Sequence, residues 1–256
     1  MFDKTPWIGT SWKMNKSRVQ AREFASALAN SPVANTHAAK LFVIPPFTAV
    51  ADVAELLAPT RVHVGAQNMH WAAAGAWTGE ISAAMLLDVG AVLVEIGHSE
   101  RRAHFGETDE TVALKTKAAI DSGMLALVCV GDTRAEYEAG QTSEVLARQV
   151  RSALSRLGAG DRAKIVIAYE PVWAIGEDGS PADPEFADLQ HRRIKSVSTG
   201  LFAEPVDVVY GGSVDPQNCV GFALQKHIDG LFIGRAAWSV LGYVGIVEKV
   251  VAALAV

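Results

Sequence analysis

Eight short apolar runs alternate with amphipathic segments along the whole chain, and this repeat restricts the fold more than any other feature. Most runs are continuously apolar, as is typical of parallel strands that helices cover. The predicted strands are Trp7–Lys13, Leu41–Pro45, Val62–Gln67, Val92–His98, Ala126–Gly131, Lys164–Glu170, Val206–Gly211 and Leu231–Gly234. Helical spacing of apolar residues predicts helices between them at Arg18–Ala29, Thr48–Leu57, Thr108–Ser122, Ser143–Leu157, Pro184–Thr199 and Gly245–Leu254.

Two α/β architectures are compatible with such a repeat. A closed (β/α)8 barrel typically needs ~250 residues, which matches this chain of 256 residues. An open nucleotide-binding sheet would instead carry a Gly-x-Gly-x-x-Gly turn after its first strand. The residues at that point are Met14, Asn15, Lys16 and Ser17. The sequence therefore predicts an α/β closed (β/α)8 barrel, formed as a single domain over residues 1–256.

Charge and composition narrow the function. The net charge of −5 argues against nucleic acid as a partner, so the charge of an anionic ligand must be met locally. The two cysteines, Cys129 and Cys219, form no disulfide framework. The N-terminus lacks a secretory pattern, and no apolar run approaches the ~18 residues that span a membrane. We expect a cytoplasmic protein that does not contact membranes.

Polar side chains end three of the predicted strands. Lys13, His98 and Glu170 each close an apolar run. In a parallel α/β barrel the active site lies at the carboxyl ends of the strands, so these three groups are expected to converge there. Any one of them alone is compatible with a salt bridge at the rim. Three together favour a catalytic site, because burying a charged group is costly unless it is paired or used.

Each of these groups fits one task in moving a proton beside a carbonyl. A partly desolvated carboxylate such as Glu170 is suited to be the general base. His98 precedes a predicted helix start, where the positive end of the helix disfavours imidazolium. A neutral His98 would therefore donate to the developing oxyanion. Lys13 supplies the local cation that an acidic protein otherwise lacks.

Glycine-rich turns and an apolar loop complete the predicted site. The backbone N–H groups of residues 211–213 and of Gly234 lie near predicted helix starts and are suited to a phosphate. The apolar segment Pro171–Gly176 directly follows the predicted base. It is either an interface or a lid that excludes water from the substrate, and its position favours the lid.

Five segments resemble the triosephosphate isomerase family and occur in the family's order. They are GTSWKMN, EIGHSERRAHFGE, AYEPVWAIG, YGGSV and DGLFIG, and together they extend over nearly the whole chain. This family is a well-known example of a glutamate base, a neutral histidine and a closing loop. The resemblance implies a TIM-barrel fold, a phosphorylated sugar as substrate and no cofactor.

The resemblance also implies roles for individual residues. Lys13, His98 and Glu170 match the family's electrostatic clamp, electrophile and base, and Glu100 matches the carboxylate that supports the lysine. The backbones of Gly176, Ser213 and Gly234 match its phosphate site. The segment Gly75–Glu80 resembles the loop that inserts into a second subunit, which implies a homodimer.

Three departures from the family pattern bear on the substrate. Ser11 replaces an asparagine, Arg235 replaces a glycine, and the loop tip reads Gly176-Glu177-Asp178-Gly179-Ser180-Pro181. Ser11 with the segments QNMHWA, GAWTGEIS and IGRAAWS resembles the subgroup that isomerises erythrulose phosphates in erythritol catabolism. Ser11 is less bulky than asparagine and would admit one extra hydroxymethyl group. We therefore favour the conversion of L-erythrulose 1-phosphate to D-erythrulose 4-phosphate over that of dihydroxyacetone phosphate to glyceraldehyde 3-phosphate.

Other functions remain open at this point. A phosphate-binding aldolase would use Lys13 as a Schiff base former, and a decarboxylase would share the barrel. A non-catalytic barrel is disfavoured because all three polar groups are present. A metal site is not expected, since no His or carboxylate cluster shows ligand spacing at the rim. His191 and His227 are predicted to lie on helix surfaces.

Overall fold

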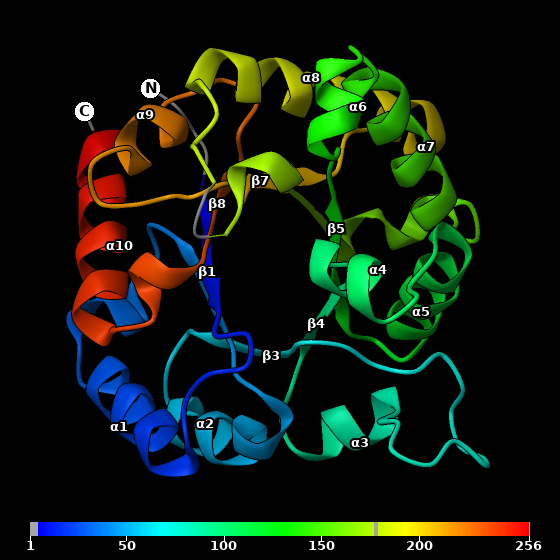
Figure 1. Cartoon of the computed structure of the whole chain (residues 1–256). Helices are drawn as coiled ribbons and strands as arrows, with labels where there is room; N and C mark the ends of the chain where they lie inside the picture. The colour runs from blue at the N-terminus through cyan, green and yellow to red at the C-terminus, as the bar shows by residue number, and fades with distance from the viewer. Residues whose placement is uncertain (1–4, 177–178, 256) are drawn as a thin grey trace.

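The computed structural model, which describes residues 5–176 and 179–255, is a closed barrel of parallel strands (Figure 1). Each strand pairs with the next along the chain, and the last pairs with the first, so the predicted (β/α)8 barrel is confirmed. The strands are β1 (Trp7–Ser11), β2 (Lys40–Ile44), β3 (His63–Ala66), β4 (Leu93–Ile96), β5 (Leu125–Val130), β6 (Ile165–Tyr169), β7 (Asp207–Tyr210) and β8 (Gly230–Ile233). Several end one or two residues earlier than predicted, so Lys13, His98 and Glu170 lie just beyond them.

Helices surround the barrel on its outside (Figure 1). The longer ones are α1 (Arg18–Ala29), α2 (Val50–Leu57), α5 (Asp109–Asp121), α7 (Thr142–Leu154), α8 (Pro184–Phe202) and α10 (Val240–Leu254). Four shorter ones complete the set: α3 (Ala83–Asp88), α4 (Ser99–His104), α6 (Arg134–Glu138) and α9 (Cys219–Ala223). Side chains fix their starts, because Ser17 and Thr108 form capping boxes. Ser239 caps α10, which therefore begins earlier than the predicted Gly245.

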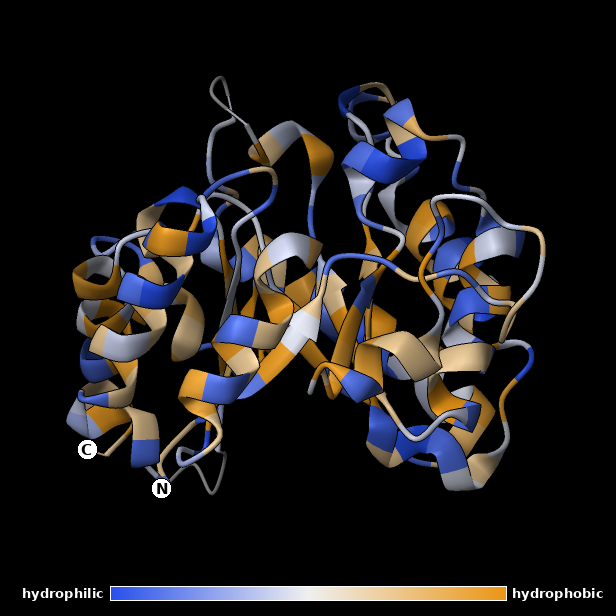
Figure 2. Cartoon of the chain, turned by 90° about the horizontal axis from the view of Figure 1, so that it is seen from below, coloured by the Kyte–Doolittle hydropathy of each residue, from blue (hydrophilic) through white to orange (hydrophobic). Residues whose placement is uncertain are grey.

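The core has two layers. One lies between the strands and the helices, and the other fills the barrel interior with side chains that include Phe42, Leu93 and Phe232. Gly9 is required here, because a Cβ atom would lie 2.2 Å from the Phe42 ring. Figure 2 shows the strands mainly apolar and most polar residues on the surrounding helices and loops. Because side chains fill the interior, a substrate cannot bind there, and the active site is expected at the carboxyl ends of the strands.

Two predictions about histidines are wrong. His191 is fully buried in α8, with its ring 5.9 Å from that of Tyr169 and 6.2 Å from that of Tyr210. His227 follows α9 and bonds to Asp188 through Nδ1 at 2.7 Å. Both residues therefore contribute to packing between elements rather than to a free helix surface.

None of the described helices has the length and apolar character needed to cross a membrane.

Candidate active site

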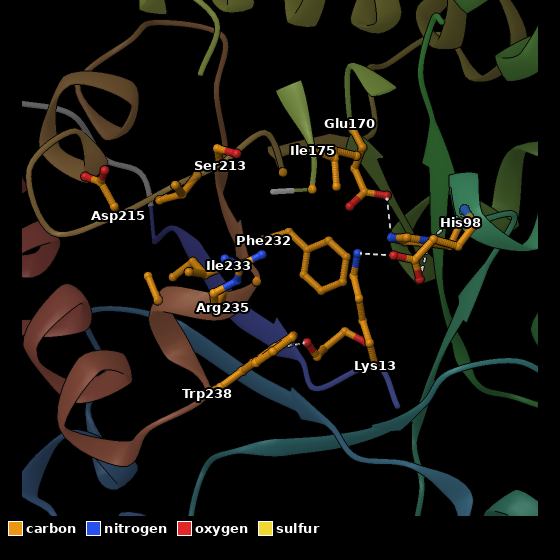
Figure 3. A pocket seen from close by; sticks show the side chains of 17 residues that line it. Lys13, His98, Glu170, Ile175, Ser213, Asp215, Phe232, Ile233, Arg235 and Trp238 are labelled. Atoms are coloured by element: carbon orange, nitrogen blue, oxygen red, sulfur yellow. Dashed lines mark hydrogen bonds and ion pairs between the residues drawn. The ribbon is translucent and has the colours of Figure 1, made fainter. Parts of the chain in front are cut away.

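A pocket opens at the carboxyl ends of the barrel strands and is lined by the predicted catalytic residues and, except for Gly212, by the predicted phosphate-binding residues (Figure 3). It is lined by Ser11, Lys13, His98, Glu100, Glu170, Ile175, Gly176, Gly211, Ser213, Val214, Asp215, Phe232, Ile233, Gly234, Arg235, Ala236 and Trp238. The side chains of Lys13, His98 and Glu170 point toward one another, whereas Ser213 and Arg235 lie across the pocket from His98 (Figure 3). The fold thus gathers residues that are far apart in the sequence.

Lys13 is held at the pocket by its backbone and its charge. It follows β1 in the left-handed region at φ 51°, and Gln67 Nε2 donates to its carbonyl at 2.8 Å. Its Nζ donates to Glu100 Oε1 at 2.6 Å. The pKa of Lys13 is raised overall. Burial acts to lower it, but the hydrogen bond to Glu100 and the negative charges nearby, including Glu170, have the larger combined effect. A raised pKa keeps the amine protonated, which suits a cation and disfavours a Schiff base.

His98 caps the first turn of α4, as the sequence predicts. The backbone N–H of Glu100 donates to His98 Nδ1 at 3.1 Å. An imidazole nitrogen that accepts a hydrogen bond carries no proton, so the neutral ring must carry its proton on Nε2. Nε2 lies 3.6 Å from Glu170 Oε2. The imidazole therefore presents a neutral N–H donor to the pocket beside the carboxylate.

Glu170 lies directly after β6 and is 5% exposed. Its Oε2 atom is buried and has no hydrogen-bond partner among the described residues. A Cβ atom on Gly211 would lie 2.7 Å from Glu170 Cγ, so only glycine at the end of β7 leaves room for this side chain. A desolvated carboxylate oxygen without a partner is available to accept a proton from a substrate.

The opposite wall offers backbone groups and a cation. Ser213 adopts φ 49°, and its Oγ donates to the carbonyl of Ala174 at 2.5 Å. No atom would lie within 4 Å of a Cβ on Gly234, so this backbone is open to the pocket. Arg235 follows it and also lines the pocket. Exposed backbone N–H groups next to an arginine are suited to a phosphate.

The segment predicted to be a lid touches the neighbouring elements. Trp173 stacks on Tyr137 with ring centroids 4.4 Å apart, and its carbonyl accepts from Arg134 Nη2 at 3.3 Å. Ile175 and Gly176 line the pocket. Closure over a substrate stays a prediction, and Glu177 and Asp178 of the loop tip lie outside the described residues.

Glu95, to which the sequence analysis assigned no role, lies beneath the pocket. It lies within β4, is 3% exposed, and its Oε2 accepts from Ser11 Oγ at 2.8 Å. Burial raises the pKa of this carboxyl to about 7. The signal that could have revealed it is a carboxylate inside the otherwise apolar run Leu93–Ile96, because such a group is costly to bury without a use.

The fold and the pocket define a class of protein. A (β/α)8 barrel presents a buried carboxylate, an imidazole donor and a lysine cation, and it faces them with a wall of backbone groups and an arginine. Among residues 5–176 and 179–255, no three His, Cys, Asp or Glu side chains cluster closely enough to hold a metal ion. Such a set of groups is suited to acid–base chemistry on a small anionic substrate.

Comparison with known proteins identifies the family. The family model for triosephosphate isomerase matches residues 6–250. The chain is 55% identical to the L-erythrulose-1-phosphate isomerase of Rhizobium meliloti (strain 1021), over 97% of this chain and 98% of the relative. It is 55% identical to the protein of that name from Mesorhizobium japonicum over the same shares, and 53% identical to that of Brucella abortus (strain 2308) over 95% of each. The chain belongs to the triosephosphate isomerase family.

Proposed function

We propose that this protein isomerises L-erythrulose 1-phosphate to D-erythrulose 4-phosphate without a cofactor. The observation that carries the acid–base chemistry is the buried Glu170 Oε2, which has no hydrogen-bond partner among the described residues and lies 3.6 Å from His98 Nε2. The four-carbon substrate is supported by the names of relatives that are 53–55% identical over nearly their full length. Ser11, which lines the pocket in place of the family's asparagine, supports it as well.

The proposed reaction moves one proton between neighbouring carbons. Glu170 removes the proton from C3, and the C–H electron pair forms the C2–C3 double bond of an enediolate while charge develops on the oxygen at C2. His98 Nε2–H donates to that oxygen and assists the proton exchange between the two oxygens. Lys13 stabilises the negative charge. Glu170 then returns a proton to C2, which leaves the carbonyl at C3.

The substrate differs from dihydroxyacetone phosphate by one hydroxymethyl group, which is attached to the carbon that loses its proton. Such a group requires space and a hydrogen-bond partner beside the reacting carbons. Ser11 is 4% exposed and lines the pocket with Lys13, to which it is close in the chain. A serine leaves room where an asparagine would not, so we assign the extra group to this corner.

Replacing Ser11 by asparagine tests this assignment of the substrate. The wild type should have a higher kcat/KM for L-erythrulose 1-phosphate than for dihydroxyacetone phosphate. In Ser11→Asn that ratio should fall by roughly 10–200-fold, because one extra carbon group in a pocket typically changes discrimination by that factor. Coupled assays of both purified proteins on both substrates measure it. A wild type that prefers dihydroxyacetone phosphate would leave triosephosphate isomerase as the function.

We also propose a homodimer formed through the Gly75–Glu80 loop. This loop lies between β3 and α3 and extends away from the barrel (Figure 1). It exposes 49% of Trp77, and Met14, which follows Lys13, is 96% exposed. Large apolar side chains that a monomer leaves in water mark an interface. A loop from a second copy that covers Met14 would also support the neighbouring Lys13.

Sedimentation equilibrium at micromolar concentration should therefore give twice the chain mass of 27.2 kDa. Trp77→Glu places a charge in the proposed interface and should shift the species toward monomer. Tyr137→Glu, at a similarly exposed aromatic residue on α6, is the matched control and should remain dimeric. A wild-type monomer with full activity would contradict the proposal.

A further inference from the structure

The carboxyl of Glu95 and the hydroxyl of Ser11 meet across the inside of the barrel. Ser11 ends β1, and Glu95 lies in β4, which is not adjacent to β1 in the closed barrel. Ser11 Oγ donates to Glu95 Oε2 at 2.8 Å. Ser11 lines the pocket and Glu95 does not. The pair therefore connects the pocket wall to a buried carboxyl behind it.

This hydrogen bond determines whether the Ser11 hydroxyl can donate to a ligand or only accept from it. A hydroxyl has one hydrogen to donate and two lone pairs that accept. Because the hydrogen points to Glu95, only acceptor capacity is left for a ligand. The backbone of Ser11 is held too, since Trp238 Nε1 donates to its carbonyl at 2.9 Å. The hydroxyl is thus oriented before any substrate binds.

Glu95 is an acidic group buried inside the barrel, and its neighbours shift its pKa. Burial, together with the charge of Glu170, raises the pKa of Glu95 to about 7, whereas the Ser11 hydrogen bond and the charge of Lys13 lower it. The carboxyl is 3% exposed among largely apolar side chains of the barrel interior, where an apolar residue would avoid the cost of burying a charge. An ionised carboxylate can only accept, so the Ser11 hydroxyl supplies the hydrogen of this bond.

We propose that Glu95 is a positioning residue that orients the Ser11 hydroxyl to accept a hydrogen bond from the terminal hydroxyl of a four-carbon ketose phosphate. This inference rests on the proposed function and extends it. Dihydroxyacetone phosphate has no hydroxymethyl group at the carbon that loses its proton, so it cannot make this contact. Glu95 thereby favours the longer substrate through Ser11, without touching it.

The test measures one ratio, kcat/KM for L-erythrulose 1-phosphate divided by kcat/KM for dihydroxyacetone phosphate. Glu95→Met keeps the side-chain length and removes the acceptor, and it should lower the ratio by ~10-fold. Glu95→Gln keeps an acceptor oxygen and should retain the ratio within about threefold. A variant that folds only in part loses activity on both substrates equally, so the ratio is insensitive to misfolding.

A double-mutant cycle separates action through Ser11 from an independent effect. Ser11→Ala should lower the ratio about as much as Glu95→Met, and the double variant should lower it no further. An unchanged ratio in Glu95→Met would overturn the proposal. Additive losses in the double variant, or a Gln variant as defective as the Met variant, would do so as well. A wild-type ratio below one would instead refute the proposed substrate itself.

Discussion

Glu170→Gln should lower kcat by ~10²–10⁴-fold, because an amide cannot accept the proton that a general base must remove. The substitution keeps the size of the side chain, so the space that Gly211 leaves for it is still filled. Glu170 Oε2 has no hydrogen-bond partner among the described residues, so no hydrogen bond of that oxygen is lost. Steady-state kinetics of the purified variant on L-erythrulose 1-phosphate measure the change.

The control for this variant is Glu248→Gln, on the exposed surface of α10. This substitution removes one carboxylate at a position that does not line the pocket. The kcat of the variant should remain close to that of the wild type. Thermal unfolding of both variants should be close to that of the wild type. Near-normal turnover in Glu170→Gln would remove the proton-transfer role from this residue.

Lys13→Ala is expected to damage substrate binding and turnover together. A cation that attracts the bound anion also stabilises the enediolate, so it acts on the ground state and on the transition state. Removal of one such group typically costs ~10²–10³-fold in kcat, and here KM should rise as well. The loss is expected to be large because Glu100 and Glu170 next to it would then face the anion without a compensating charge.

Lys117→Ala is the matched control, because Lys117 lies on α5 and pairs at the surface with Asp121. It should leave both constants near the wild-type values. Inhibition by inorganic phosphate gives a second measurement, independent of turnover. If Lys13→Ala binds phosphate as tightly as the wild type, the positive charge that holds the substrate lies elsewhere in the pocket.

The barrel and its main polar residues could be predicted from local patterns. Continuously apolar runs indicate parallel strands, and the carboxyl ends of such strands meet at one rim, so Lys13, His98 and Glu170 could be placed together. The start of α4 at Ser99 could also be expected from the sequence. Their roles in catalysis stay predictions, and the variants above test those of Glu170 and Lys13.

Other features depend on which strands and helices face each other, and a local pattern does not contain that information. Glu95 is adjacent to Ser11 only because the barrel closes and brings β4 opposite β1. His191 is buried because its side of α8 packs on Tyr169 and Tyr210. Lys13 is predicted to end the first strand, but β1 ends at Ser11 and Lys13 adopts a left-handed backbone, which the local pattern does not predict.

NMR of the purified protein with L-erythrulose 1-phosphate in deuterium oxide follows the proposed proton transfer directly. We expect D-erythrulose 4-phosphate as the product, with deuterium on the carbon next to the phosphate-bearing carbon, because Glu170 exchanges its proton with solvent before returning it. Glu170→Gln should form this product more slowly by the factor given above. The proposed reaction would be contradicted if the L-erythrulose 1-phosphate signal stayed unchanged in a preparation that converts dihydroxyacetone phosphate. Cleavage of the carbon chain would contradict it as well.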